Sequence, residues 1–139
     1  MKGYKNNPKA NADVFVDGWM RSGDLGKIDE DGFVTIADRL KELIKVNAYQ
    51  VPPAELEGII REHPAVFDAA VVGIPDEKTG ERPKAFVVLN KDAKISNKDI
   101  MEYVNDRVAP YKRLKEVQFL DVIPKNASGK ILRRVLVEQ

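Results

Sequence analysis

The stretch PPAELEGIIREHPAVFDAAVVGI, residues 52–74, contains a helix signal followed immediately by a strand signal. Pro52-Pro53 opens a segment in which apolar residues recur at helical spacing, and Pro64 ends it. The nearly continuous apolar run Val66–Ile74 then predicts a strand that is buried on both faces. A helix that leads into a buried strand is therefore the expected centre of the fold.

The flanking sequence extends this pattern into a small α+β domain. A second Val-rich run, Ala85–Leu89, follows the turn-like composition DEKTGERP, which predicts two antiparallel strands. Ser96 and Asp99 resemble a capping box at the start of a second helix, which we expect to end before Pro110. The other expected elements are a strand in ELIKV (residues 42–46), a strand over residues 117–122 and a terminal helix over residues 131–137. Of these elements, the strands over residues 66–74, 85–89 and 117–122 are expected to form a three-stranded antiparallel sheet, and helices flank it in a domain over residues 39–139.

A hairpin is expected ahead of this domain. Two short apolar stretches, Leu25–Ile28 and Phe33–Ile36, are separated by the turn composition Asp29-Glu30-Asp31-Gly32. The first thirteen residues, MKGYKNNPKANAD, are rich in Asn and Lys and are expected to form a loop.

Composition excludes several classes of protein and leaves others open. With 43% hydrophobic and 32% charged residues and no long apolar run, the chain resembles a soluble globular protein without a membrane span. The absence of cysteine fits an intracellular location, and no targeting signal is visible. The net charge is only +1, yet residues 110–139 carry +4. Such a basic segment suits a phosphorylated small molecule, an acidic neighbouring domain or, less well because no aromatic residues interleave with the charges, nucleic acid.

Four stretches in order resemble the carboxy-terminal part of the adenylate-forming acyl-CoA synthetases, which include 4-coumarate-CoA-ligase-like enzymes, fatty acyl-CoA ligases and beetle luciferase. They are MKGYKNNP from Met1, GWMRSGDLG from Gly18, DRLKELIKVNAYQVPPAELE from Asp38, and PKNASGKILRR from Pro124. The resemblance implies an ATP-dependent reaction in which a carboxylic acid becomes an acyl-adenylate, after which the thiol of CoA displaces AMP.

The resemblance also implies roles for individual residues. Lys130 matches the catalytic lysine that contacts the α-phosphate and the substrate carboxylate, and a small glycine-containing loop suits a lysine that must reach an anion. Asp24 matches the aspartate that accepts hydrogen bonds from the ribose hydroxyl groups, and Arg39 matches an arginine that reaches the ribose or a phosphate.

Two further features concern the second half-reaction. Lys41 matches the hinge about which the small domain of the family rotates between its two poses. After that rotation, the face formed by Lys45, Val46, Asn47, Ala48 and Tyr49 is expected to replace Lys130 at the active site. Many relatives of the family have glycine where this chain has Ala48, and the extra methyl group lies where glycine would let the pantetheine arm of CoA pass close to the backbone.

The resemblance leaves the other parts of the active site outside this chain. Residues 1–38 match the tail of a large amino-terminal domain, which we expect to be partly disordered without that domain, and residues 39–139 match the small domain. The large domain is an expected partner and would hold the phosphate-binding loop and the pocket that selects the carboxylic acid. ATP, Mg²⁺ and CoA are expected for the full-length enzyme and none for the isolated fragment, in which we expect no metal ligand and no activity.

Two other functions stay open at this point. The small domain could be a free-standing module that docks an acidic partner, or the enzyme could form an adenylate and use an acceptor other than CoA. Nucleic acid is not an expected partner, and the expected location is the cytoplasm or the peroxisome.

Overall fold

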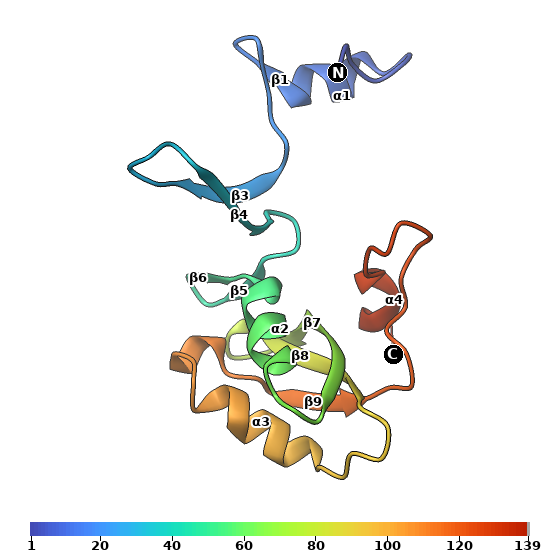
Figure 1. Cartoon of the computed structure of the whole chain (residues 1–139). Helices are drawn as coiled ribbons and strands as arrows, with labels where there is room; N and C mark the ends of the chain where they lie inside the picture. Colours follow the sequence, from blue (N-terminus) through green and yellow to red (C-terminus); the bar gives the residue numbers. More distant parts are fainter. Residues whose placement is uncertain (139) are drawn as a thin grey trace. The chain divides into compact units, whose positions relative to one another are not determined.

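The computed structural model describes residues 1–138 and divides the chain into two compact units, Met1–Lys41 and a second unit that begins at Glu42 (Figure 1). Within the described residues, no helix has the length and apolar character needed to cross a membrane.

The first unit is built from local elements. Its first helix lies where the sequence predicted a loop: Asn7 accepts a hydrogen bond from the Ala10 backbone N–H, and Pro8 occupies the first turn, where a missing N–H costs nothing. The predicted hairpin is present, and the Asp29 side chain accepts the backbone N–H groups of Asp31 and Phe33 in its turn. The elements are α1 (Pro8–Val14), β1 (Phe15–Val16), β2 (Trp19–Met20), β3 (Asp24–Ile28) and β4 (Val34–Arg39).

Every apolar side chain of the first unit is at least partly exposed. Trp19 is 81% exposed, and Ile28 and Phe33 of the hairpin are 72% and 71% exposed. A two-stranded hairpin with no buried apolar face gains little stability from its own packing. Whether this unit is partly disordered without a larger domain stays a prediction.

The second unit holds the hydrophobic core and confirms the predicted small α+β domain with antiparallel strands and helices (Figure 1). Its long strands β7 and β8 pair antiparallel over their whole length, from Val66 opposite Leu89 to Asp76 opposite Gly80. The elements are β5 (Ile44–Val46), β6 (Tyr49–Val51), α2 (Pro53–Arg61), β7 (Val66–Asp76), β8 (Gly80–Leu89), α3 (Asn97–Asn105), the short 3-10 helix η1 (Pro110–Lys112), β9 (Glu116–Phe119) and α4 (Arg133–Val137).

The sheet differs in two respects from the three antiparallel strands that were expected. It has five strands, because β5 joins the sheet next to β8 and β6 pairs with β5 across a short turn; β6 has only three residues, too few for the sequence to reveal it. In addition, β9 runs parallel to β8, since the chain crosses over through α3 before it returns to the sheet. Ser96 caps α3 through the predicted capping box with Asp99.

Both faces of the sheet are covered, which explains the nearly continuous apolar runs in β7 and β8. One set of alternating residues, including Ala69 and Val71, packs with Leu56 and Ile60 of α2 and with residues of α3. The opposite set, including Ala70 and Val72, packs with Leu136 of α4. A strand buried on both faces needs apolar side chains at successive positions.

Candidate functional site

The hairpin of the first unit brings Asp24 and Arg39 together. The two residues lie opposite each other in the register of β3 and β4, and Arg39 Nε lies 2.9 Å from Asp24 Oδ1. The Asp24 side chain is 23% exposed and that of Arg39 is 51% exposed, so solvent screens the pair and it adds little stability. The pair leaves Asp24 Oδ2 and most guanidinium N–H groups of Arg39 without a partner among residues 1–138. A ligand with hydroxyl or phosphate groups could therefore bind both side chains.

Lys130 lies in a loop that its own hydrogen bonds close. Asn126 Oδ1 accepts hydrogen bonds from the backbone N–H groups of Ser128 (3.0 Å) and Lys130 (2.8 Å), and the Asn126 N–H donates to the Lys130 carbonyl at 2.9 Å. Gly129 adopts a φ of 80°, a conformation that favours glycine. No atom lies within 4 Å of the position that a Cβ would take at Gly129, so a ligand could approach the backbone there. The Lys130 side chain is exposed and has no acidic partner in the described part of the chain.

Lys41 is the last residue of the first unit; it is exposed and lies in a turn over residues 40–42. The turn follows β4 directly, and the Leu40 N–H donates to the Gly23 carbonyl at 2.9 Å. The expected hinge residue thus stands at the division between the two compact units.

The residues of the expected thioester-forming face make a hairpin of β5 and β6. Val46 is buried, whereas Lys45, Asn47, Ala48 and Tyr49 are exposed. Asn47 has a φ of 54°, and its N–H donates to the Thr79 carbonyl at 2.7 Å. This contact fixes the hairpin turn to the β7–β8 turn. The φ of Ala48 is not positive, so the backbone conformation at this position does not require glycine.

Aromatic stacking extends this hairpin toward η1. The rings of Tyr49 and Tyr111 stack with centroids 4.2 Å apart, and Lys112 Nζ donates to the Glu55 carboxylate at 2.6 Å. Lys112 is therefore held against α2. Within the second unit, Lys130 lies in the loop closed by Asn126, whereas Lys45–Tyr49 belong to the β5–β6 hairpin.

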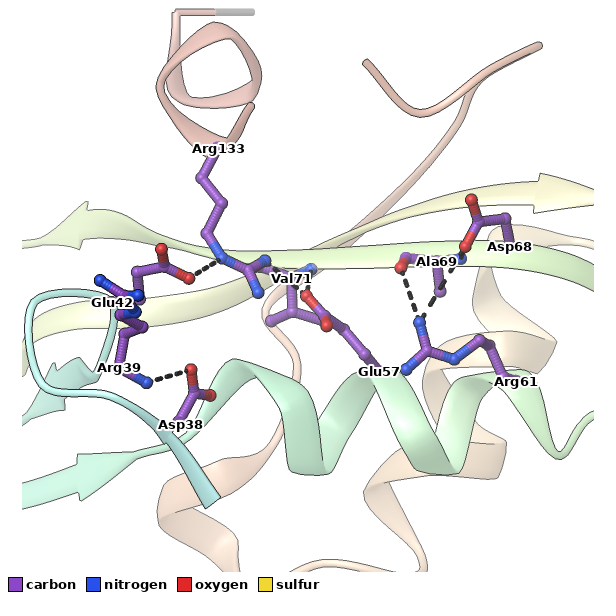
Figure 2. A network of polar contacts seen from close by, with 9 residues as sticks. All are labelled: Asp38, Arg39, Glu42, Glu57, Arg61, Asp68, Ala69, Val71 and Arg133. Atoms are coloured by element: carbon purple, nitrogen blue, oxygen red, sulfur yellow. Dashed lines mark hydrogen bonds and ion pairs between the residues drawn. The ribbon is translucent and has the colours of Figure 1, made fainter. Parts of the chain in front are cut away.

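A partly buried ionic cluster at the free edge of β7 was not predicted from the sequence. Arg133 Nη1 donates to Glu57 Oε1 and, at 2.9 Å, to the Val71 carbonyl, and its Nε donates to Glu42 Oε2 at 2.7 Å (Figure 2). Glu57 also accepts the Val71 N–H at 2.9 Å. The two side chains thus pair the Val71 backbone, which would otherwise lie unpaired at the edge of the sheet.

The pKa of Arg133 reports this environment. Burial by itself lowers the pKa, but the hydrogen bond and charge of Glu57, followed by those of Glu42, outweigh burial and hold it above its ordinary value. One signal in the sequence pointed to the cluster, because helical spacing places Glu57 on the same face of α2 as the apolar residues Leu56 and Ile60. In the structure the Glu57 side chain is only 5% exposed. A carboxylate on an apolar face predicts a buried cationic partner.

A second ionic contact anchors the other end of the Lys130 loop. Lys125 Nζ donates to Asp68 Oδ2 on β7, and Asp68 also lies near Arg61 of α2 (Figure 2). Arg61 Nη1 reaches the Ala69 carbonyl at 3.4 Å, so charged side chains cover the edge of β7 at Ala69 as well as at Val71.

Comparison with known proteins identifies the family. Residues 55–130 match the model of the AMP-binding enzyme C-terminal domain. The chain belongs to this family. It is 50% identical over 139 residues to 4-coumarate--CoA ligase-like 4 from Oryza sativa subsp. japonica and 52% identical over 139 residues to peroxisomal OPC-8:0-CoA ligase 1 from Arabidopsis thaliana. Both alignments cover 99% of this chain, and they cover 25% and 26% of the two relatives.

A solved structure of the family has the same fold. ATP-bound MatB from Rhodopseudomonas palustris superposes with a TM-score of 0.93 at 38% identity, over 99% of this chain and 27% of MatB. The AMP-binding C-terminal domain described here thus spans about a quarter of the length of its curated relatives, which are CoA ligases.

Proposed function

We propose that this chain forms the carboxy-terminal part of a longer, ATP-dependent acid–CoA ligase. In the proposed reaction, a carboxylic acid attacks the α-phosphate of ATP to give an acyl-adenylate and pyrophosphate, and the thiol of CoA then displaces AMP. Membership of the AMP-binding C-terminal domain family and the names of the CoA ligases that the chain resembles support the proposal.

The observation that carries the proposal is the state of Lys130. Its ammonium group is exposed and unpaired within residues 1–138, while its backbone is held in a closed loop by Asn126. An ammonium group on a side chain whose backbone is held in place, and which has no protein partner, can stabilise negative charge that develops on a phosphate. We assign to Lys130 the stabilisation of the α-phosphate and the acid carboxylate during adenylation.

Asp24 and Arg39 are proposed to bind the nucleotide. The free Asp24 Oδ2 can accept a hydrogen bond from a ribose hydroxyl group, and the unpaired N–H groups of Arg39 can donate to the ribose or to a phosphate. Their contact orients both side chains before the nucleotide arrives, which lowers the entropy lost on binding.

Lys41 is proposed as the hinge, and Lys45–Tyr49 as the face that accompanies CoA in the second half-reaction. A hinge residue must change its backbone torsion angles, and the exposed position of Lys41 in the turn over residues 40–42 leaves room for that change. The methyl group of Ala48 lies on the exposed hairpin turn, where it narrows the approach of a pantetheine arm relative to glycine. This residue favours one alternative, an adenylate-forming enzyme that uses another acceptor.

The large amino-terminal domain of the longer protein is the proposed partner. The exposed apolar side chains of the first unit, such as Trp19 and Phe33, offer it a surface to pack on. Among residues 1–138, no group of three or more His, Asp or Glu side chains is placed to hold a metal ion. Without that domain the chain is expected to be inactive. The proposed location is the cytoplasm or the peroxisome, and a peroxisomal relative supports the latter.

Pyrophosphate exchange by the full-length protein, measured with a panel of carboxylic acids, tests the proposal. We expect exchange that depends on the acid, followed by thioester formation when CoA is added. Lys130→Ala should slow adenylation on the order of 10²-fold to 10³-fold, as the loss of one preorganised electrostatic contact does. Normal exchange by Lys130→Ala would contradict the role of Lys130.

The same assay separates the alternatives. An enzyme that uses another acceptor would exchange pyrophosphate but form no thioester with CoA. A free-standing module that docks an acidic partner would show neither activity.

A further inference from the structure

Both ends of the Lys130 loop are anchored to the same strand. At the start of the loop, Lys125 pairs with Asp68 of β7 and bridges to Ile131 across the loop. Beyond the loop, Arg133 donates to the carbonyl of Val71, also on β7. Between these anchors, Asn126 holds the loop closed. The loop is therefore fixed to β7 at two points, the Asp68 side chain and the Val71 carbonyl, which lie three residues apart in the sequence.

Arg133 is the stronger of the two anchors. Its side chain is 18% exposed, and it reaches acceptors on three separate segments: Glu42 at the end of the turn over residues 40–42, Glu57 on α2 and Val71 on β7. By contrast, Lys125 is 38% exposed and reaches one carboxylate. A buried charge with two carboxylate partners has few other orientations available, so it holds its helix α4 in one position.

We propose that Arg133 is a positioning residue for the Lys130 side chain: it clamps the segment after Lys130 to β7 and α2, so that Lys130 is presented at a fixed point of the small domain. The inference rests on the proposed function of Lys130. It means that Lys130 travels with the domain as a rigid body, and that its loop does not reorder at each turnover.

The geometry requires arginine and not simply a positive charge. Nε bonds to Glu42 while Nη1 bonds to Glu57 and to the Val71 carbonyl. A lysine ammonium has donors on one atom only, so it cannot reach Glu42 and Glu57 with the fixed separation of the guanidinium fork. Arg133→Lys therefore keeps the positive charge but loses the simultaneous hydrogen bonds to Glu42, Glu57 and the Val71 carbonyl, so it tests the arrangement of donors separately from the charge.

Single-turnover assays on the full-length protein test the proposal, with acid plus ATP for adenylation and a supplied acyl-adenylate plus CoA for thioester formation. We expect Arg133→Lys to slow adenylation on the order of 10-fold, because a small displacement of a catalytic group is costly. Thioester formation should change by less than about twofold, since Lys130 serves the first step. The matched control is Arg134→Lys, which should leave both steps unchanged, because the Arg134 side chain is 92% exposed and, among residues 1–138, pairs only with Glu138.

A double variant separates positioning from a general structural role. If Arg133 acts through Lys130, then adding Arg133→Lys to Lys130→Ala should not slow adenylation further. Multiplicative effects in the double variant, or an equal loss in both half-reactions of Arg133→Lys, would overturn the inference and leave the proposed function standing. If Lys130→Ala itself does not slow adenylation, both the proposed function and this inference fail.

Discussion

Removing the Arg133 side chain should destabilise the second unit by about 3 kcal/mol, the lower part of the range for a broken buried ion pair. Arg133→Met keeps most of the apolar stem. Among residues 1–138 it leaves Glu57, whose side chain is 5% exposed, with a single donor, the Val71 N–H. It also removes the donor to the Val71 carbonyl. Glu42 adds little to the cost, because it is 35% exposed and water can replace the arginine there.

Urea denaturation measures this loss. For a small domain with a slope of about 2 kcal/mol per molar urea, a loss of about 3 kcal/mol lowers the midpoint by roughly 1.5 M. The matched control is Arg134→Met, which should stay within about 0.5 kcal/mol because its side chain lies in solvent.

A second variant tests whether the uncompensated charge is the cause. Glu57→Gln combined with Arg133→Met removes the buried charge yet retains an oxygen that accepts the Val71 N–H, so it should be more stable than Arg133→Met alone by about 1–2 kcal/mol. The reasoning is refuted if Arg133→Met costs less than about 1 kcal/mol, or if Glu57→Gln brings no recovery in its presence.

Three other changes probe separate parts of the chain. Lys41→Pro in the full-length protein should slow thioester formation more than adenylation, since proline restricts φ at the proposed hinge. The two single-turnover assays measure the difference, and equal slowing of both steps would count against a hinge at Lys41. The pKa of Asp76 is held below its ordinary value, chiefly by the hydrogen bond from Lys115, which outweighs a smaller opposing effect of burial. The ionised form of Asp76 therefore stabilises the fold above about pH 4, and that stabilisation is lost as the pH falls further. Asp76→Asn should therefore flatten the acid side of the stability profile measured by thermal unfolding, and an unchanged acid slope would contradict this. Ser96→Ala removes the capping box of α3 and should cost about 1 kcal/mol in urea denaturation, whereas Ser96→Asp should retain most of the stability.

Local patterns in the sequence were sufficient for the elements that depend on near neighbours. The helix α2 follows from Pro53 and from apolar residues at helical spacing, the capping box at Ser96 starts α3, and the turn at Asp29 closes the β3–β4 hairpin. The family of the chain also followed from the sequence, because its motifs recur in a fixed order. Each of these signals lies within a few residues or is a linear pattern, so no knowledge of the tertiary structure is needed.

The contacts that join distant parts of the chain were decided only by the tertiary structure. The parallel direction of β9 depends on where the crossover through α3 returns, and the fifth strand depends on the short turn at Asn47-Ala48. The cluster of Arg133 with Glu57 joins residues 76 positions apart, and its acceptor at Val71 is a backbone group that carries no mark in the sequence. The sequence by itself determined which residues are apolar or charged and where a helix is capped. The partner of a buried charge follows from the folded geometry, because a backbone carbonyl becomes an unpaired acceptor only when its strand lies at the edge of a sheet.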